Sequence, residues 1–158
     1  MFGAALADRL IARGWEVTLV EQFEPGDPRS ESGGETRLLR WSHGADGFYA
    51  ESAWRARSVW RELGVLEEVG AIWFARREDG WESESERVLR AHGIPVERLD
   101  PAATAELFPS LATDDLAFGL LEPAAGVLRA GDGVRALVCI AKYSPMRQQR
   151  GRRSGALK

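Results

Sequence analysis

The strongest constraint on the fold comes from residues 3–21, where a helical segment leads directly into an apolar strand. Residues 3–14 are rich in alanine and leucine, their apolar side chains share one helical face, and Gly14 suits a C-terminal cap. Residues 15–21 combine β-branched and apolar side chains and end in an acid, which predicts a buried strand. A helix that feeds such a strand is the second half of a βαβ unit. The sequence therefore predicts an α/β fold.

The remaining elements follow from hydrophobic spacing and from proline and glycine positions. Residues 23–35 contain two prolines and three glycines, which predicts a loop. Helices are predicted over residues 47–63, 83–91 and 131–138, with a short helix opening at Asp100-Pro101, and strands over residues 71–75, 116–121 and 126–128. The buried stripe of the 47–63 helix is predicted to consist of Tyr49, Ala53, Ala56, Trp60 and Leu63.

Gly3 and Glu21 are spaced as in a dinucleotide-binding βαβ unit. In such a unit a glycine lets the backbone approach a pyrophosphate at the helix N-terminus, where free N–H groups favour anions. An acid at the end of the second strand then accepts hydrogen bonds from ribose hydroxyls. The same two residues also fit an ordinary helix and strand of any α/β domain, so both interpretations remain open at this point.

A second candidate site lies in residues 32–40, SGGETRLLR. Gly33 and Gly34 allow a backbone to lie against a ligand, and Arg37 and Arg40 would be one turn apart if the segment were helical. Arginine pairs bidentately with carboxylate or phosphate and keeps its charge. The alternative is a surface loop whose arginines are solvated.

The sequence offers little support for a metal site, a disulfide or a membrane span. Cys139 is the one cysteine, so neither an internal disulfide nor a cysteine metal cluster is predicted, and a reducing cytoplasm fits this usage. His43 and His92 have no further ligands at metal spacing, and we expect a structural role for His43 and helix capping for His92. No apolar run reaches the ~18–20 residues of a transmembrane helix.

Residues 139–158 differ in charge from the rest of the chain. They hold six of the 21 basic residues and none of the 24 acidic ones. Only Tyr143 accompanies them as an aromatic, so non-specific nucleic-acid binding is the most that this tail supports, and a nucleic-acid partner is not expected. A small non-enzymatic protein with such a tail is one alternative function. A fragment of an NAD-dependent dehydrogenase, which shares the βαβ start, is another.

Residues 3–40 and 121–128 carry several motifs in order, and together they resemble the D-amino-acid-oxidase-type FAD-dependent oxidoreductases, in particular the sarcosine oxidase and N-methyl-tryptophan oxidase branch. That branch has a helix after a glycine motif, a strand ending in an acid, a Phe-x-Pro-Gly loop and a Gly-x-Thr-Arg-x-x-Arg segment. The last piece matches ETRLLR at residues 35–40, and LEPAAGVL at residues 121–128 resembles the family's Glu-Pro-x-x-Gly-Val-Leu stretch. The resemblance covers residues 2 to about 138.

The resemblance implies an FAD cofactor and assigns roles to individual residues. The implied cofactor-binding residues are Gly3, Glu21, Gln22, Ser32, Gly33, Gly34, Thr36 and Arg37. Gly3 would be the third glycine of the pyrophosphate loop, Glu21 would bind the adenosine ribose, and Arg37 would lie beside the isoalloxazine ring. Arg37 and Arg40 are the implied catalytic residues, with Arg40 binding the substrate carboxylate.

The resemblance also implies a domain plan. A partial FAD-binding Rossmann-like domain of the glutathione-reductase type, lacking its first strand, would cover residues 1–70. The start of a mixed-sheet substrate domain would cover residues 71–128, a helix returning to the FAD domain would cover residues 129–138, and residues 139–158 would be a tail foreign to the family.

The implied reaction oxidises the C–N bond of an amino acid or N-methyl amino acid, and dioxygen reoxidises the flavin. Gly33 stands where the sarcosine oxidase branch commonly has a histidine, which argues against sarcosine itself as the substrate. Since the family's enzymes are much longer, we expect this chain to be a truncated, inactive fragment that binds FAD weakly or not at all.

Overall fold

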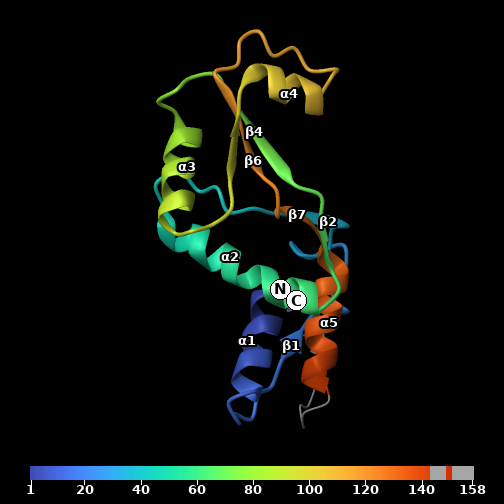
Figure 1. The fold of residues 1–158 in the computed structure, drawn as a ribbon. Coiled ribbons are helices and arrows are strands. Elements are labelled where there is room, and N and C mark those ends of the chain that lie inside the picture. Colours follow the sequence, from blue (N-terminus) through green and yellow to red (C-terminus); the bar gives the residue numbers. More distant parts are fainter. Residues whose placement is uncertain (143–148, 151–158) are drawn as a thin grey trace, which may run out of the picture. The chain divides into compact units, whose positions relative to one another are not determined.

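The computed structural model describes residues 1–142 and 149–150 of the chain (Figure 1). The chain belongs to the α/β class, as the sequence predicts. It contains helices, one parallel strand pair and two three-stranded sheets. Most of the basic tail, residues 143–148 and 151–158, lies outside the described residues.

The chain divides into two compact units, which are described separately. Unit 1 comprises Met1–Arg37 and Arg129–Lys158, and unit 2 comprises Leu38–Leu128. The domain plan of the sequence analysis has its boundaries after residues 70, 128 and 138. The assignment of an FAD domain and a substrate domain to parts of the chain stays a prediction.

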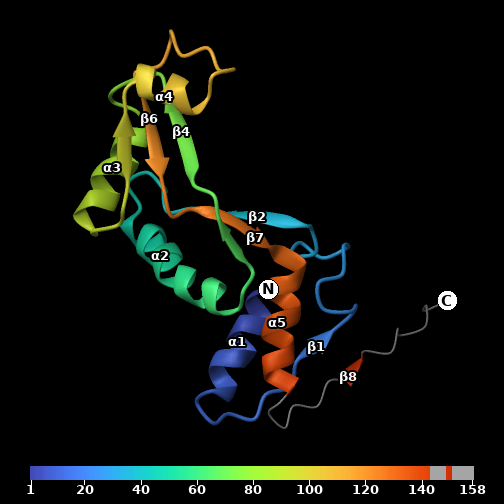
Figure 2. The same ribbon diagram turned by 45° about the vertical axis from the view of Figure 1, so that its right-hand side comes forward.

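Unit 1 consists of two helices that pack on each other and a short parallel strand pair (Figure 2). Its elements are α1 (Phe2–Ile11), β1 (Val20–Glu21), α5 (Ala130–Lys142) and β8 (Gln149–Arg150). The small side chains of Ala4 and Ala7 are buried in α1, as are Val134 and Leu137 in α5. Both helices were predicted, and Gly14 follows α1 with a φ of 80°, a conformation that favours glycine.

The buried strand predicted over residues 15–21 is largely wrong. Only Val20–Glu21 forms a strand, and the side chains of Trp15 and Val20 are 66% and 65% exposed. In the described part of the chain, the two-residue β8 is the one strand that pairs with β1. A strand is buried only where a sheet and covering helices surround it, and these apolar residues have no such surroundings within unit 1.

Unit 2 is built on two three-stranded sheets. The first has the order β2-β7-β3, formed by β2 (Thr36–Leu39), β7 (Gly126–Arg129) and β3 (Leu66–Glu68). The second has the order β4-β6-β5, formed by β4 (Ala71–Ala75), β6 (Phe118–Glu122) and β5 (Glu97–Leu99). Both neighbours of β6 run antiparallel to it, and its Leu120 lies opposite Trp73 of β4. The predicted strands at residues 71–75, 116–121 and 126–128 are thus confirmed within one or two residues of their bounds.

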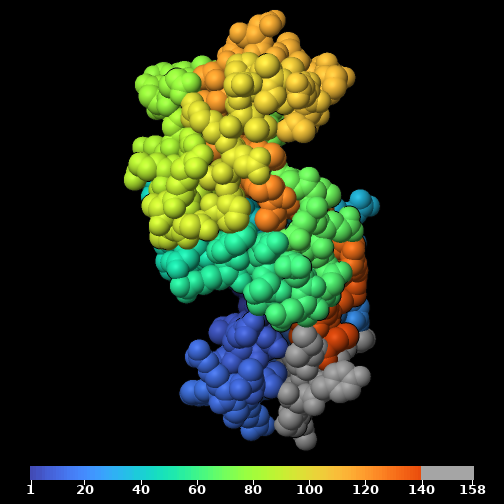
Figure 3. All heavy atoms as spheres, viewed as in Figure 1, coloured from blue at the N-terminus to red at the C-terminus, as the bar shows by residue number. Residues whose placement is uncertain are grey.

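Three helices cover these sheets: α2 (Gly47–Glu62), α3 (Trp81–Ala91) and α4 (Pro101–Leu107). The helices α2 and α3 lie side by side at the surface of the unit (Figure 3). The predicted start of α4 is confirmed, because the Asp100 side chain caps the helix by accepting from Ala103 N at 2.8 Å. In α2 the predicted stripe is wrong at Tyr49, which is 58% exposed, because the neighbouring Ala50 is the residue that turns toward the core.

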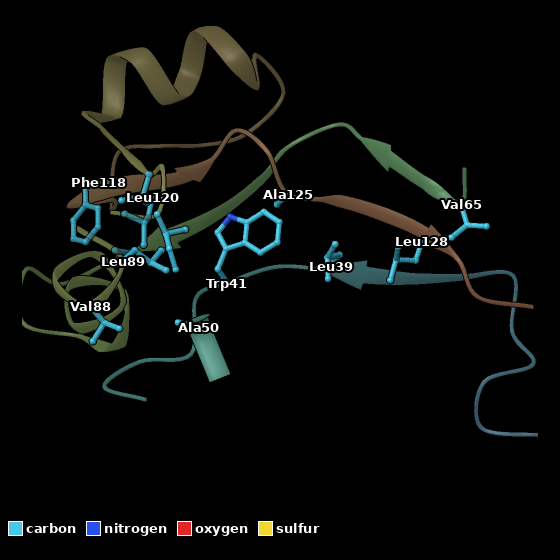
Figure 4. Close-up of a cluster of buried hydrophobic side chains, with 13 residues drawn as sticks. Leu39, Trp41, Ala50, Val65, Val88, Leu89, Phe118, Leu120, Ala125 and Leu128 are labelled. Carbon is cyan, nitrogen blue, oxygen red and sulfur yellow. The ribbon is translucent and has the colours of Figure 1, made fainter. Parts of the chain in front are cut away.

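The hydrophobic core of unit 2 is centred on Trp41, which is fully buried (Figure 4). Its indole lies between Leu39 and Leu128 on one side and Leu89 and Leu120 on the other. Alternation along β6 points residues 118, 120 and 122 to the core face, so an acid, Glu122, follows two apolar residues into the interior.

Candidate functional site

Arg40 directly follows β2 and is held, half-buried, among aromatic side chains. Its guanidinium carbon lies 4.9 Å from the ring centroid of Trp73 and 5.9 Å from that of Trp81. The two indoles contact each other edge to face with centroids 5.1 Å apart. Such stacking stabilises a cation without neutralising it.

The charge of Arg40 has no acidic partner among the residues that the structure describes. Its Nη1 donates to the carbonyl oxygen of Ser42, which fixes the side chain against its own backbone. No ion pair to a carboxylate accompanies this hydrogen bond in residues 1–142 and 149–150. Arg40 is therefore a partly desolvated cation that can accept an anionic ligand.

Glu122 is a fully buried carboxylate at the end of β6. It accepts three N–H groups: Trp41 N at 2.6 Å, Ser42 N at 3.3 Å and Trp73 Nε1 at 2.7 Å. Hydrogen bonds of this kind compensate the loss of hydration that burial imposes on a charge. The sequence analysis identified Glu122 only as part of a family motif. A signal for its burial was present, since it continues the inward alternation of an apolar strand.

Two polar side-chain atoms in the same segment are buried without a hydrogen-bond partner in the described structure: Trp41 Nε1 and Ser42 Oγ. Such atoms are rare in native interiors, and they concentrate where a ligand or water completes the site. Both belong to the two residues that follow Arg40.

His43 lies half-buried beside the ring of Tyr49, with centroids 5.8 Å apart. Burial lowers the pKa of His43 below its usual 6.5, and the neighbouring Arg40 guanidinium lowers it further against the opposing effect of Glu122 and Asp46. The imidazole is therefore neutral at pH 7, and it adds no second positive charge beside Arg40.

The residues predicted for the adenosine end of a cofactor lie in unit 1. Gly3 stands in the first turn of α1, whose N-terminus has no side-chain cap. A Cβ at Gly3 would meet only Leu19 Cδ1 at 3.7 Å, so the position is open. Glu21 ends β1, and its Oε1 accepts from the backbone N–H of Gln22 at 2.7 Å, which turns the carboxylate back toward the chain.

The segment of residues 32–37 also belongs to unit 1. Gly33 has no room for a side chain, because a Cβ there would lie 1.7 Å from the carbonyl oxygen of Asp27. The exposed Arg37 donates from Nη1 to Thr36 O at 2.7 Å and from Nη2 to Glu31 O, and its guanidinium lies against Gly34. Ser32 is half-buried in this loop.

Arg37 and Arg40 would lie one turn apart only if their segment were helical. It is not helical, since Thr36–Leu39 is a strand. The two arginines belong to different units.

Gly33 and Gly34 line a cavity of about 420 Å³ in unit 1 that the sequence did not predict. The first turn of α5 forms the opposite wall, with Gly131 and Asp132. Asp132 accepts from Arg129 at 3.0 Å and from Arg135 at 2.5 Å, and these hydrogen bonds lower the pKa of the Asp132 carboxyl. The spacing Arg-x-x-Asp-x-x-Arg at residues 129–135 could have indicated this cluster.

In the described part of the chain, no group of three His, Cys, Asp or Glu side chains could hold a metal ion. None of the helices formed by the described residues has the length and apolar character needed to cross a membrane.

Comparison with known proteins assigns the chain to a family. Residues 1–143 match the DAO family of FAD-dependent oxidoreductases, and the chain belongs to this family. The resemblance stated from the motifs is thereby confirmed at the level of the family, and the sarcosine oxidase branch stays a prediction. No curated protein sequence matches the chain.

Solved structures share the fold at low sequence identity. They include L-proline dehydrogenase from P. horikoshii, with a TM-score of 0.75 and 18% identity over 92% of this chain and 40% of that chain. Glycine oxidase from Geobacillus kaustophilus has a TM-score of 0.68 and 24% identity over 92% and 43% of the respective chains. Iminodiacetate oxidase from Chelativorans sp. BNC1 has a TM-score of 0.68 and 23% identity over 94% and 44%. The chain therefore spans about 40% of the length of these enzymes.

Proposed function

We propose that this chain is part of an FAD-dependent oxidoreductase that oxidises the C–N bond of an amino acid or N-methyl amino acid, with Arg40 binding the substrate carboxylate. The observation that carries the proposal is the state of Arg40 in a member of this family: a half-buried cation, stacked on Trp73 and Trp81, without an acidic partner in the described chain. The planar guanidinium can pair with a carboxylate through two parallel hydrogen bonds.

The residues of this chain fit the adenosine end of FAD. The uncapped first turn of α1, with an open position at Gly3, offers N–H groups to a pyrophosphate, and Glu21 supplies an acceptor at the end of β1. Gln22, Ser32, Gly33, Gly34, Thr36 and Arg37 are the other proposed cofactor-binding residues. When bound, FAD supplies the acceptor for the two electrons removed from the substrate, and dioxygen is its proposed reoxidant.

The task of unit 2 in this reaction is to hold the substrate. A carboxylate paired with Arg40 fixes the position of the adjacent carbon and nitrogen, and such fixation lowers the entropic cost of reaction. The indoles of Trp73 and Trp81 shield one side of the guanidinium from water, which strengthens the pairing.

The names of the similar structures support this substrate class. The enzymes named for L-proline, glycine and iminodiacetate all act on small compounds with a carboxylate next to a C–N bond. We extend that class to this chain and retain N-methyl amino acids, as in the sarcosine oxidase branch, although Gly33 argues against sarcosine itself. A cytoplasmic location remains part of the proposal.

The 158-residue chain by itself is proposed to be inactive and to bind FAD weakly. The basis is unit 1, where β1 has two residues and Trp15 before it is exposed. A purified chain that carries one flavin per molecule through gel filtration, as measured by its visible absorbance, would contradict this part of the proposal.

The carboxylate proposal can be tested without FAD, because Trp73 and Trp81 report on Arg40. We expect L-proline to change the tryptophan fluorescence saturably, and L-prolinamide, which lacks the carboxylate, to have little effect. Arg40→Ala should weaken L-proline binding at least about tenfold, since a charged hydrogen-bonded pair contributes about 1.5–3 kcal/mol. The matched control is Arg55→Ala on the exposed face of α2. Equal binding by Arg40→Ala and the wild type would refute the role of Arg40.

A further inference from the structure

We infer that Glu122 is the positioning residue of Arg40: one buried carboxylate fixes both the backbone and the aromatic surface that orient the guanidinium. This inference rests on the proposed role of Arg40 in binding the substrate carboxylate. It assigns to Glu122 a part in substrate binding through Arg40 and no contact with the substrate itself.

The first support is the connection through the backbone. Glu122 accepts the N–H groups of Trp41 and Ser42, the two residues that follow Arg40, at 2.6 and 3.3 Å. The carbonyl oxygen of Ser42 in turn accepts from Arg40 Nη1. The peptide groups of Ser42 therefore join the carboxylate on one side to the guanidinium on the other.

The second support is the connection through the indole. Oε1 of Glu122, which accepts from Ser42 N, also accepts from Trp73 Nε1 at 2.7 Å. Trp73 is the ring over which the guanidinium of Arg40 lies at 4.9 Å. The contacts close a ring that runs from Glu122 through Ser42, Arg40 and Trp73 back to the same carboxylate oxygen.

The chemistry of the carboxylate explains why position 122 holds an acid. Two oxygens with four lone pairs accept three converging N–H groups, whereas a glutamine would offer one acceptor oxygen and turn an NH₂ group toward a donor. Glu122 is fully buried, and it forms no ion pair within the described chain. A buried charge without a cationic partner is costly, and apolar residues fill such positions more cheaply. Its presence beside Arg40 points to orientation rather than to core stability.

The test compares Glu122→Gln with Glu97→Gln, a control at an exposed glutamate of β5 in the same sheet. Two readouts are measured on the 158-residue chain: the NMR signals of the Arg40 Nε–H and Trp73 Nε1–H groups without ligand, and L-proline affinity from tryptophan fluorescence. We expect Glu122→Gln to shift the Trp73 signal upfield, to broaden or lose the Arg40 signal, and to weaken L-proline binding about tenfold. Glu97→Gln should match the wild type.

A loss of stability alone must not be mistaken for a loss of positioning. Val96→Ala shortens a buried side chain next to β5, so it lowers stability without touching Arg40. It should leave the Arg40 signal and the affinity of the folded protein unchanged. If Glu122→Gln does not fold, Trp73→Phe decides instead, because it removes one N–H donor of the ring while keeping an aromatic surface. Trp73→Phe should weaken L-proline binding as well.

The outcomes separate the two claims. The inference is overturned if a folded Glu122→Gln variant keeps both the Arg40 signal and the affinity for L-proline of the wild type. Where Glu122→Gln does not fold, the same result for Trp73→Phe overturns it. If Arg40→Ala binds L-proline like the wild type, the proposed function fails, and the Arg40 signal of Glu122→Gln still tests positioning. If Arg40→Ala abolishes binding and Glu122→Gln does not weaken it, only the positioning role is refuted.

Discussion

The two units of this chain bury very different side chains. Unit 2 encloses large residues, among them Trp41, Leu89 and Phe118, in one continuous core. Unit 1 buries mainly small residues, such as Ala4 and Ala7, between its two helices, while Trp15 is left largely exposed. Since apolar burial drives folding, unit 2 has the means to stabilise itself and unit 1 has little.

This difference separates the proposed substrate site from the proposed cofactor site. Arg40 and its surroundings stand in the well-packed unit, where rotamers are locked by neighbours, as a substrate site requires. Gly3 and Glu21 stand in the unit that buries little. We therefore expect the carboxylate site to remain organised under conditions in which the proposed cofactor site does not.

The largest expected effect tests the contrast in packing directly. Leu89→Ala in α3 empties a fully buried position and should lower the free energy of unfolding by about 2–5 kcal/mol. Leu6→Ala in α1, where the side chain is 60% exposed, should change it by no more than about 0.5 kcal/mol. Urea unfolding followed by tryptophan fluorescence measures the first variant, because unit 2 contains every tryptophan except Trp15. Far-UV circular dichroism of the same titration measures the second variant. If both variants lowered the free energy of unfolding by similar amounts, the two units would be packed equally well.

A second pair of variants compares two glycines within unit 1. Gly33→Ala forces a Cβ to within 1.7 Å of Asp27 O unless the loop moves, so it should destabilise the loop by at least about 1 kcal/mol. Gly3→Ala lies in an open helical position and should stabilise α1 by about 0.5–1 kcal/mol. Trypsin cleavage after Arg29 measures the loop, and far-UV circular dichroism on heating measures the helix. Slower cleavage in Gly33→Ala than in the wild type would contradict the close approach.

Much of unit 2 could be predicted from the sequence because its signals are local. The Asp100-Pro101 pair marks a helix start through a side chain and a ring that act within one turn, and the structure confirms it. The strand at residues 71–75 was recognisable by its apolar run. Tyr49 was misplaced because a helical stripe is set by the surface that it packs against, and a shift of one residue turned Ala50 inward instead.

The prediction failed where structure depends on distant parts of the chain. Residues 15–19 have strand composition, yet a strand needs partners that the local sequence does not specify. In the candidate site, Glu122 likewise depends on a distant part of the chain. Its hydrogen bond to Trp41 N joins residues 81 positions apart, so no local pattern shows that the carboxylate meets the segment after Arg40. Arg40 could be singled out as a candidate from the sequence, because its motif is contiguous.

A pH titration should affect unit 2 through His43. Burial and Arg40 lower the pKa of His43 in the folded state, so the unfolded state binds the proton more tightly. The stability associated with this residue is complete above pH 6.5 and falls as the pH drops below that value. We expect the urea midpoint to decrease between pH 7 and pH 5 in the wild type and to decrease less in His43→Gln. An equally large decrease in His43→Gln would contradict the assignment.

The smallest expected effect belongs to unit 1 and lies in a different pH range. Asp27 accepts hydrogen bonds from the Arg29 side chain at 2.8 Å and from Arg29 N at 2.9 Å, and these bonds lower the pKa of its carboxyl from 3.8 to about 2. The stabilisation of the loop is therefore present above pH 3.8 and is lost as the pH falls toward about 2. Trypsin cannot be used at this pH, so the measurement is the NMR signal of the Arg29 Nε–H group. We expect this signal to shift as Asp27 is protonated. Asp27→Asn should remove that titration and leave the response of unit 2 near pH 6.5 intact, because an exposed pair contributes little beyond its own loop. A change in the His43 titration on Asp27→Asn would show that the two units respond to pH together.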